Sequence, residues 1–477
     1  MNDVFKKTGL GAVAALALCA AVSIGVTASA AATGQAAKPV AAAPTFNKDV
    51  APIVFKNCTN CHRPGEIAPM SLLTYKDARP WAKSIATQVG KGAMPPWHAD
   101  PKHGEFLNDR RLSDADRATL VSWAAGGAPE GNPGDLPAPP TYESGWTIGV
   151  PDAIFAMNED YPIPAAGEIP YQFIEIATNL TEDKWVQAFE VKAGDPKSLH
   201  HVIVYARPPA APPAARPTAP PAGAQAAARP APPPPLFNFA PGMDIPAGQF
   251  GGPPLPPEQR KPAFPNQRGP VRVGPAVGGF VPGQFIRVYQ DGTAMKLPAG
   301  TTLVLQMHYT TYGKASTDRT RIAVKYAKQP PATQLRWASL QNGALHIPAG
   351  ASDHRVDAEM VLGADVTLWS MLPHTHVRGI RWIYDATYPD GRKETLLSVP
   401  NYDFNWQTDY VFKQPLKLPK GTTLHATAWY DNSTANKANP DPAKDVWWGD
   451  QTWEEMMFTG LTFSIDPVKT STAAGQQ

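Results

Sequence analysis

The sequence predicts a multidomain protein in which a small all-α domain is followed by two tandem all-β, jelly-roll-like sandwiches. Its 477 residues are too many for one hydrophobic core. Helix signals are concentrated in residues 44–130, whereas short runs of alternating apolar residues dominate residues 143–467. A proline-rich segment at residues 208–275 holds 22 of the 54 prolines and interrupts the β pattern.

Residues 1–30 have the pattern of a secretory signal peptide. Two lysines precede an apolar run at residues 10–26, and the small residues Ala28-Ser29-Ala30 follow it. We therefore expect the mature protein to be periplasmic or secreted. A lipid anchor on Cys19 is the alternative, and Leu18 argues against it because lipid-modification sites carry a small residue at that position.

The composition of the remaining chain excludes several classes of protein. Charged residues make up 18% of the sequence and the net charge is +2, so there is no basic field for nucleic acid and no acidic tail. Beyond the signal, no apolar run approaches the ~18 residues that a membrane-spanning helix requires. Removal of the signal leaves only Cys58 and Cys61, which excludes a disulfide framework.

Residues 44–130 contain the most specific chemical motif of the chain. Cys58-Thr59-Asn60-Cys61-His62 is Cys-x-x-Cys-His, the attachment signature of a c-type haem, with two thioether bonds and His62 as an axial iron ligand. A redox-active cysteine pair or half a zinc site is disfavoured, because a histidine follows directly and no second cysteine pair exists. The motif predicts a cytochrome c domain that binds one covalent haem.

Three helices are expected around this motif. Residues 47–56 form a short amphipathic helix that enters it, and residues 76–89 form a second helix. Ser113 is the expected N-cap of a closing helix that ends near Ala125, with Asp116 in the capping-box position and two glycines as the stop.

The second axial ligand of the haem is expected to be a methionine, which is common in electron-transfer haems. Met94 lies in the sequence Met94-Pro95-Pro96-Trp97, which resembles the methionine ligand loop of class I cytochromes c. Met70 is the alternative and is otherwise expected to fill the core. His98 is an outside candidate that we expect to be a surface histidine.

The first sandwich is expected at residues 143–335, after a proline- and glycine-rich linker at residues 131–142. Alternating apolar runs at residues 171–176 and 185–191, separated by turn residues, are typical of an all-β sandwich. The insert at residues 208–275 has too little apolar surface to order itself, so we interpret it as a disordered loop without catalytic content.

The second sandwich is expected at residues 336–467 and is followed by a polar tail at residues 468–477. Residues 421–432 repeat the pattern of residues 300–311 after a similar Leu-Pro lead-in. This repeat favours two related β domains in tandem. It places Trp429 where the first copy has His308.

Histidines on these strands are candidate metal ligands. His374 and His376 are two residues apart, so on a strand both side chains would lie on one face roughly 6.5–7 Å apart. Alone, such a pair is more often a solvated strand face. His200 and His201 are adjacent, so they share an ion only if their strand bulges or ends there. His308 by itself is expected to be a structural histidine.

Four short motifs occur together in a recognisable order: His200-His201, residues 305–309 around His308, His374-Thr375-His376, and Glu455-Met456. In this order they resemble the ascorbate-dependent type II copper monooxygenases, the family of the peptidylglycine α-hydroxylating and dopamine β-monooxygenases. The resemblance covers about residues 145–465, apart from the insert.

The resemblance implies two mononuclear copper sites with different ligands. The electron-transfer copper would be held by His200, His201 and His308. The catalytic copper that binds O₂ would be held by His374, His376 and Met456. A thioether ligand independently favours Cu(I) over zinc. Because strand residues alternate, Met456 and Met457 cannot both face the metal.

The chain also departs from the family pattern at two positions. Peptide-amidating relatives have an arginine where this chain has Leu372, and a tyrosine where it has Gly460. The group that would hold a peptide carboxylate is therefore missing. The animal enzymes are rich in disulfides and this chain has none, and the fused haem domain suggests a different source of electrons.

These observations predict an exported copper monooxygenase that hydroxylates a C–H bond of a small organic substrate with O₂. Electrons would enter through the haem from a periplasmic redox protein or a small reductant. The main alternative is a non-catalytic periplasmic electron-transfer or copper-binding haem protein. A weaker alternative is a sandwich binding module with a haem sensor. The remaining histidines are expected to be structural: His103, His346, His354 and His425.

Overall fold

The computed structural model of the chain describes residues 43–209, 237–239, 275–281 and 286–467, apart from residues 65, 67, 143, 144 and 450. The predicted signal peptide, the polar tail and all but a few residues of the proline-rich insert lie outside the described residues. In the part that the structure describes, no helix combines the length and apolar character needed to cross a membrane.

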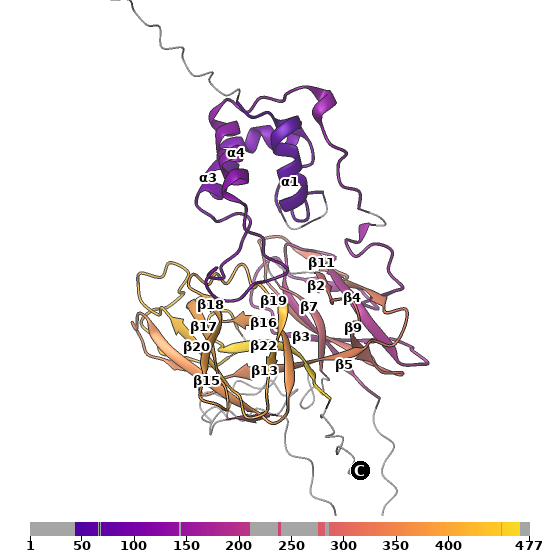
Figure 1. Cartoon of the computed structure of the whole chain (residues 1–477), viewed down its shortest axis with the longest axis vertical. Coiled ribbons are helices and arrows are strands. Elements are labelled where there is room, and N and C mark those ends of the chain that lie inside the picture. Colours follow the sequence, from indigo (N-terminus) through magenta and orange to yellow (C-terminus); the bar gives the residue numbers. More distant parts are fainter. Residues whose placement is uncertain are drawn as a thin grey trace, which may run out of the picture. The chain divides into compact units, whose positions relative to one another are not determined.

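Among the described residues the named helices lie between Phe46 and Asp135, and all but the last of them fall within the predicted helical region, residues 44–130 (Figure 1). They are η1 (Phe46–Val50), α1 (Ala51–Asn57), α2 (Tyr75–Ala78), η2 (Arg79–Trp81), α3 (Ala82–Gly90), α4 (Asp114–Ala125) and η3 (Pro133–Asp135). The helix expected at residues 76–89 is interrupted by the tighter turn η2. The interruption coincides with Pro80, which lacks a backbone N–H and disfavours a continuous α-helix.

The helical region, residues 44–130, has its own apolar core. Phe46 and Trp123 are fully buried and their ring centroids are 5.9 Å apart. The predicted cap of α4 is present, because the Ser113 hydroxyl accepts a hydrogen bond of 3.0 Å from the backbone N–H of Asp116. α4 therefore closes this core where the sequence places it.

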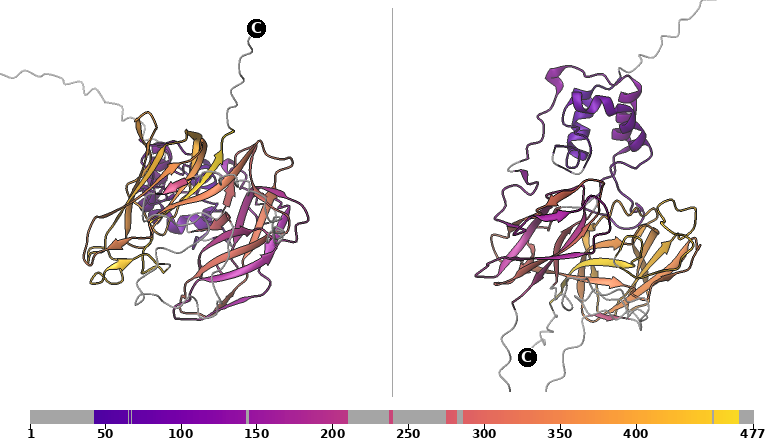
Figure 2. Two further views of the ribbon diagram at one scale, coloured as in Figure 1. Left: turned by 90° about the horizontal axis from the view of Figure 1, so that it is seen from below. Right: turned by 180° about the vertical axis from the view of Figure 1, so that it is seen from behind.

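In the remainder of the described chain the named elements are all β-strands, joined by loops, which is compatible with the predicted sandwich class (Figure 2). The first β-region, residues 143–335, contributes strands to a nine-stranded sheet, forms a four-stranded sheet and a two-stranded sheet, and has its own hydrophobic cluster. Its strands are β1 (Ala153–Ala156), β2 (Tyr161–Ile163), β3 (Gln172–Ala177), β4 (Lys184–Lys192), β5 (Leu199–Arg207), β6 (Phe237–Phe239), β7 (Ala276–Phe280), β8 (Ile286–Val288), β9 (Thr293–Leu297), β10 (Thr302–Tyr309), β11 (Ser316–Asp318) and β12 (Arg321–Tyr326).

The second β-region, residues 336–467, is built around a second cluster of buried apolar side chains. Its strands are β13 (Thr333–Gln341), β14 (His346–Ile347), β15 (His354–Leu362), β16 (Val366–His374), β17 (Gly379–Thr387), β18 (Lys393–Val399), β19 (Tyr410–Leu418), β20 (Thr423–Tyr430), β21 (Val446–Trp447) and β22 (Phe458–Ile465). β6, which comes from the proline-rich insert, pairs with β15 at the edge of one sheet. At least this part of the insert is therefore a strand.

One sheet continues from the first β-region into the second. β13 pairs in parallel with β9 and antiparallel with β22, within the strand order β1-β12-β4-β9-β13-β22-β16-β19. The predicted boundary at residues 335/336 lies inside β13. The two β-regions are therefore joined by backbone hydrogen bonds as well as by the chain.

The segment after α3, residues 91–112, packs into the second β-region. Trp97 and Phe106 are 7% and 8% exposed and belong to the apolar cluster of that region. The ring of Trp97 meets that of Tyr410 edge-on at a centroid distance of 5.1 Å. The backbone N–H of Asp100 also donates to the carbonyl of Ser398 at 2.9 Å. This segment contributes side chains to a core that the sequence assigned to the sandwich alone.

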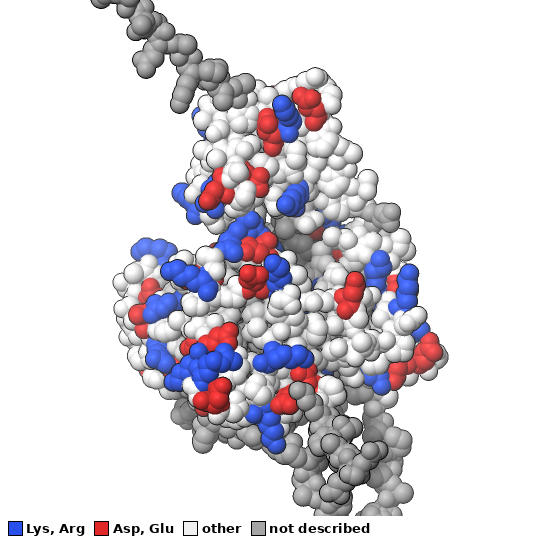
Figure 3. Space-filling model, viewed as in Figure 1, with Lys and Arg blue, Asp and Glu red and all other residues white. Residues whose placement is uncertain are grey.

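Basic and acidic side chains are interspersed over the described surface in the face drawn in Figure 3. This face shows no broad area of one sign. This mixture of signs agrees with the small net charge of +2.

Candidate metal centre

His200, His201 and His308 come together on two neighbouring strands. β5 and β10 are antiparallel, and their register shifts so that His308 lies opposite His201 while Tyr309 lies opposite Leu199. His200 is the extra residue of this bulge. The bulge that the sequence required for two adjacent histidines to share an ion is therefore present.

The imidazole nitrogens of this first histidine set converge on one point. Each residue offers one nitrogen, and these three nitrogens lie within 4.8 Å of one another. The Nδ1 atoms of His200 and His201 are 3.1 Å apart, and Nδ1 of His308 is buried without a hydrogen-bond partner. Buried nitrogens rarely lack partners, so this arrangement fits a metal ion ligated through Nδ1.

Tyr171 supports the first set from outside. Its hydroxyl is 3.0 Å from Nε2 of His201, and its ring centroid is 4.8 Å from that of His308. A partner on the nitrogen that does not bind metal holds the tautomer and the ring orientation of a ligating histidine. Sequence analysis missed Tyr171, because nothing in its local pattern distinguishes it from another core aromatic.

The second set is His374 at the end of β16 and His376 just beyond it. Nδ1 of His374 is 2.7 Å from Oε1 of Gln407, and Nδ1 of His376 is 3.1 Å from the carbonyl of Glu454. Both rings therefore use Nδ1 for a protein acceptor. Nε2 of His376 is buried without a partner. This pair fits a metal ion bound through Nε2, with the opposite ring nitrogen from the first set.

Glu455 shapes the loop that carries the second set. Its buried carboxylate accepts hydrogen bonds from the backbone N–H of His376 and Arg378, both at 2.7 Å, and of Met456 at 3.3 Å. Burial raises the pKa of Glu455 to about 8, against the opposing effect of these donors. One side chain thus holds the backbone of two candidate ligands.

The expectation that Met456 and Met457 lie on a strand was wrong, because β22 begins only at Phe458 and both methionines precede it. In this loop the backbone of Glu455 forms an isolated bridge with Trp448, while its side chain accepts the three hydrogen bonds described above. The distinction between the two methionines nevertheless agrees with the sequence argument. Met456 lines a pocket together with His201 and His374, whereas Met457 is fully buried in the apolar core.

The two histidine sets face each other as one cluster. The ring centroids of His201 and His374 are 6.4 Å apart, and Phe404 contacts both His200 and His376. Sequence analysis treated the sets as separate sites in separate sandwiches. Their closeness follows from the sheet that β13 carries through both β-regions, which no local pattern encodes.

Burial lowers the pKa of every histidine in the cluster. The pKa is lowered to about 3 for His200 and to about 4 for His308 and His374, and it is well below 6.5 for His201 and His376. Repulsion between neighbouring imidazolium charges adds to the effect of burial at most of these positions. All five rings are therefore neutral near pH 7, which is the state that binds a metal ion.

The residues of the Cys-x-x-Cys-His motif are compatible with a haem. Cys58 and Cys61 are free, and burial raises the pKa of the Cys58 thiol to about 12, which disfavours a reactive thiolate. Nδ1 of His62 is 3.3 Å from the carbonyl of Met70, so Nε2 remains for iron. The Met70 side chain packs against the helical core, as expected of a core filler, and Met94 is partly buried.

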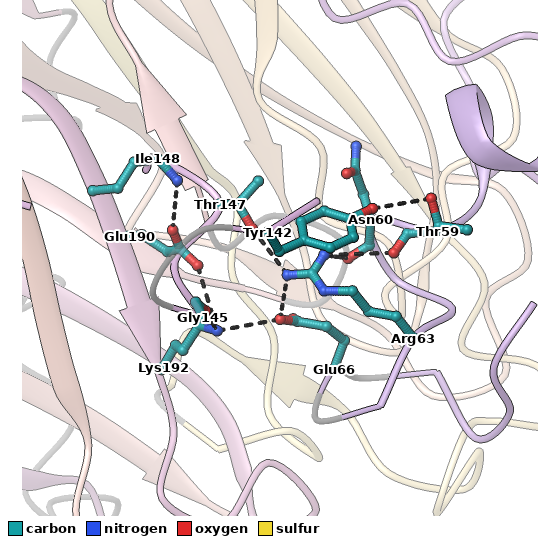
Figure 4. A network of polar contacts seen from close by, with 10 residues as sticks. All are labelled: Thr59, Asn60, Arg63, Glu66, Tyr142, Gly145, Thr147, Ile148, Glu190 and Lys192. Atoms are coloured by element: carbon teal, nitrogen blue, oxygen red, sulfur yellow. Dashed lines mark hydrogen bonds and ion pairs between the residues drawn. The ribbon is translucent and has the colours of Figure 1, made fainter. Parts of the chain in front are cut away.

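Arg63, which directly follows His62, joins the helical region to β4 (Figure 4). It is 6% exposed, and its guanidinium lies 3.7 Å from the ring centre of Tyr142. It bonds Glu66 at 2.6 Å and the Thr147 hydroxyl at 3.1 Å, and Glu66 also pairs with Lys192 at 3.3 Å. The sequence contained no signal for this network.

We expect Arg63→Ala to lower the free energy of unfolding by about 3 kcal/mol, because it leaves Glu66 with a buried charge and one partner fewer. Urea denaturation followed by circular dichroism measures this loss. Arg117→Ala is the matched control. Arg117 forms an exposed pair with Asp114 at 3.8 Å, so its loss should cost less than about 0.5 kcal/mol. Equal effects of the two substitutions would contradict a structural role for the Arg63 network.

Two of the histidines expected to be structural have structural partners. Nε2 of His346 is 2.8 Å from Asp445, and its ring stacks on Trp447 at 3.9 Å. Nε2 of His425 is 2.7 Å from Asp357. His98 differs from the expected surface histidine: burial lowers its pKa, because the segment around Trp97 packs into the second β-region.

Comparison with known proteins adds no relative. No protein-family model and no curated protein match the chain. Among solved structures, an allantoicase is 9% identical over 57% of this chain and 79% of that chain, with a TM-score of 0.14. Structures of infectious bursal disease virus, strains Gx and Gt, are each 10% identical over 66% and 65% of this chain and 67% and 66% of theirs, with TM-scores of 0.16 and 0.15. Scores this low carry no argument.

Proposed function

We propose that the protein is an exported copper-dependent monooxygenase that hydroxylates a C–H bond of an organic substrate. The observation that carries the proposal is the cluster of five neutral histidines from two β-regions, four of them buried and His200 partly buried, beside Met456. Two of these rings have a buried nitrogen without a hydrogen-bond partner, His308 and His376. Such nitrogens are costly unless a ligand binds them.

The two donor sets suit different tasks. Three imidazoles, from His200, His201 and His308, suit a copper ion that exchanges single electrons. Two imidazoles and the soft thioether of Met456 favour Cu(I) and leave room for a further ligand. When bound, copper at these sites would supply one-electron transfer and O₂ activation. This assignment is the basis for calling His374, His376 and Met456 catalytic.

The protein groups around the cluster orient and shield it. Tyr171, Gln407 and the carbonyl of Glu454 each occupy the ring nitrogen that points away from a proposed ion. They hold a proton or a lone pair at a defined atom and prevent the rings from turning. The low exposure of the rings, 1% for His376 and 4% for His308, excludes bulk water.

The proposed reaction converts R–H, O₂, two electrons and two protons to R–OH and water. The electrons must come from a donor, and the Cys58-Thr59-Asn60-Cys61-His62 motif supplies the residues for a covalent haem c that would deliver them one at a time. Arg63 bonds Glu66, and Glu66 pairs with Lys192 of β4, the strand that precedes β5 and its histidines in the chain. An external periplasmic redox protein or small reductant would reduce the haem again after each transfer.

Metal analysis of the purified protein tests this proposal. We expect about two copper ions and one iron per chain, because the chain offers two copper donor sets and one haem motif. His308→Ala should remove about one copper and leave the iron, as measured by elemental analysis with copper EPR. His425→Ala is the control: His425 lies outside the cluster and is bonded to Asp357, so this substitution should leave the copper content unchanged.

Turnover then separates the proposal from a non-catalytic copper and haem protein. Consumption of O₂ coupled to haem oxidation and product formation would support the monooxygenase. Full occupancy by copper without any O₂ consumption would favour electron transfer or copper binding alone. Zinc in place of copper in protein purified without added metal would contradict both.

A further inference from the structure

A pocket opens beside the histidine cluster between the two β-regions. Its cavity volume is about 90 Å³, it is open to solvent on one side, and His201, His374 and Met456 line it. A small molecule in this pocket would therefore lie against the proposed catalytic ligands. Its chemistry is constrained by the remaining side chains of the wall.

The wall next to Met456 is aromatic and aliphatic. Trp337 from β13 and Phe458 from β22 lie with ring centroids 5.9 Å apart, and Leu372 from β16 is beside them in the pocket. Val202 and Ile203 from β5 also line the pocket. Surfaces of this kind favour apolar ligands through burial and ring contacts.

Gly460 makes room for the indole of Trp337. Leu372 and Gly460 are register partners on β16 and β22. A Cβ atom built on Gly460 would lie 3.2 Å from Nε1 of Trp337 and 3.6 Å from Cβ of Leu372. The Trp337 side chain thus occupies the space above Gly460, where any larger residue would push it away.

The charge that faces the pocket is already neutralised. Arg287 contributes to the wall, but its guanidinium pairs with Asp409 at 2.6 Å, and Asp409 is 2% exposed. Arg287 also donates to the hydroxyl of Thr462 at 3.1 Å. A charged substrate would lose its hydration here without gaining an uncompensated partner.

Most polar groups of the wall are engaged as well. Oε1 of Gln407 is bonded to His374 and its Nε2 donates to the carbonyl of Phe404. Oε1 of Gln306 accepts from the Tyr205 hydroxyl, while its Nε2 has no partner among the described residues. That amide can donate one hydrogen bond to a substrate oxygen.

We propose that the substrate is a neutral, largely apolar molecule, such as an aromatic hydrocarbon or phenol, that packs on Trp337 and Phe458. This inference rests on the proposed function for the reaction, but the binding itself does not require copper. A carboxylate finds no unpaired cation at Arg287, and an ammonium group finds no unpaired carboxylate at Asp409, because these two residues pair with each other, so we expect both classes of ion to bind poorly.

Binding of three matched probes tests the inference. 4-Fluorotoluene, 4-fluorophenylacetate and 4-fluorophenethylammonium share one ring and differ in charge, and ¹⁹F NMR of each with the reduced full-length protein gives its Kd. We expect the neutral probe to bind at least tenfold more tightly than either ion. Equal or tighter binding of an ion, or no binding of the neutral probe, would overturn the inference.

Variants locate the binding. Trp337→Ala should weaken 4-fluorotoluene at least tenfold, and the milder Trp337→Phe should weaken it less while preserving the fold. Leu372→Arg places a cation in the wall and should shift the preference toward 4-fluorophenylacetate. Trp429→Ala is the control. Trp429 lies on β20 and does not line this pocket, so all three Kd values should stay unchanged. If the Kd values of all three probes stay unchanged in both Trp337 variants and in Leu372→Arg, the proposed binding position is wrong.

The two proposals fail in different ways. If the neutral probe binds as expected and the protein contains no copper, the copper-monooxygenase function is wrong and the pocket assignment stands. If copper is present and O₂ is consumed while the charged probes bind best, the substrate class is wrong and the proposed function stands.

Discussion

Replacing Met456 by leucine should remove the sulfur ligand of the proposed second copper site and lower the proposed hydroxylation by orders of magnitude. The swap nearly conserves volume, so the free energy of unfolding should change by less than about 1.5 kcal/mol. Imidazole ligation by His374 and His376 alone stabilises Cu(I) less well than ligation that includes a soft thioether. X-ray absorption of the Cu(I)-loaded protein should lose its copper–sulfur contribution, and the haem spectrum should stay unchanged.

Met457→Leu is the matched control for this experiment. Met457 is fully buried in the apolar core of the second β-region, whereas Met456 lines the pocket beside the cluster. The control should retain both the sulfur signal and activity. If the two variants exchange behaviours, the loop register around Glu455 is shifted by one residue. If neither variant changes the copper spectrum, the thioether site does not exist.

The copper-free protein should unfold in mild acid, at a higher pH than is usual for a folded domain. The pKa of His200 is about 3 when folded, that of His308 and His374 is about 4, and the ordinary value is 6.5. A folded pKa below the unfolded one means that the unfolded chain binds more protons. The contribution of these histidines to the free energy of unfolding is therefore complete above pH 6.5. It falls as the pH drops toward 4, by about 1.4 kcal/mol per pH unit for each such histidine.

Urea titrations between pH 7.5 and 4.5, after removal of copper with a chelator, measure this loss. Several histidines act together, and a domain is stable by only about 5–15 kcal/mol, so unfolding without denaturant is expected before pH 4.5. His308→Leu should make the dependence on pH shallower by about one proton. His425→Gln, outside the cluster, should leave it unchanged. A free energy of unfolding that is flat from pH 6.5 to 5 would contradict a cluster of buried neutral histidines.

Local features of this fold were predictable because their causes are local. Ser113 was identified as a helix cap from residues three positions apart, and the structure confirms the hydrogen bond to Asp116. The bulge at His200 followed from strand alternation, since two adjacent histidines cannot otherwise face one ion. Pro80 shows the limit of the same reasoning: the helical periodicity around it was visible, but the turn that it imposes was not foreseen.

The site was predictable residue by residue but not as an arrangement. The candidate ligands were chosen by motif order, and three of them, His200, His201 and His308, converge in the structure. The closeness of His201 to His374 depends on pairing between β9, β13 and β22, which are far apart in sequence. Glu455 was seen only as part of a motif, because its role depends on backbone N–H groups nearly eighty residues away.

The aromatic pair Trp97 and Phe106 bears on how this chain can be divided. Both side chains are encoded before the predicted linker at residues 131–142 and are buried among strands encoded after residue 336. A C-terminal fragment expressed from the linker onward would therefore have a cavity in place of these two rings. The free energy of unfolding should fall by about 3–5 kcal/mol for each missing aromatic side chain. The N-terminal fragment would expose the same two rings to water. Expression of the halves separately should give poorly soluble products. Replacing the helical region by another domain would require keeping residues 91–112 together with the strands that bury them.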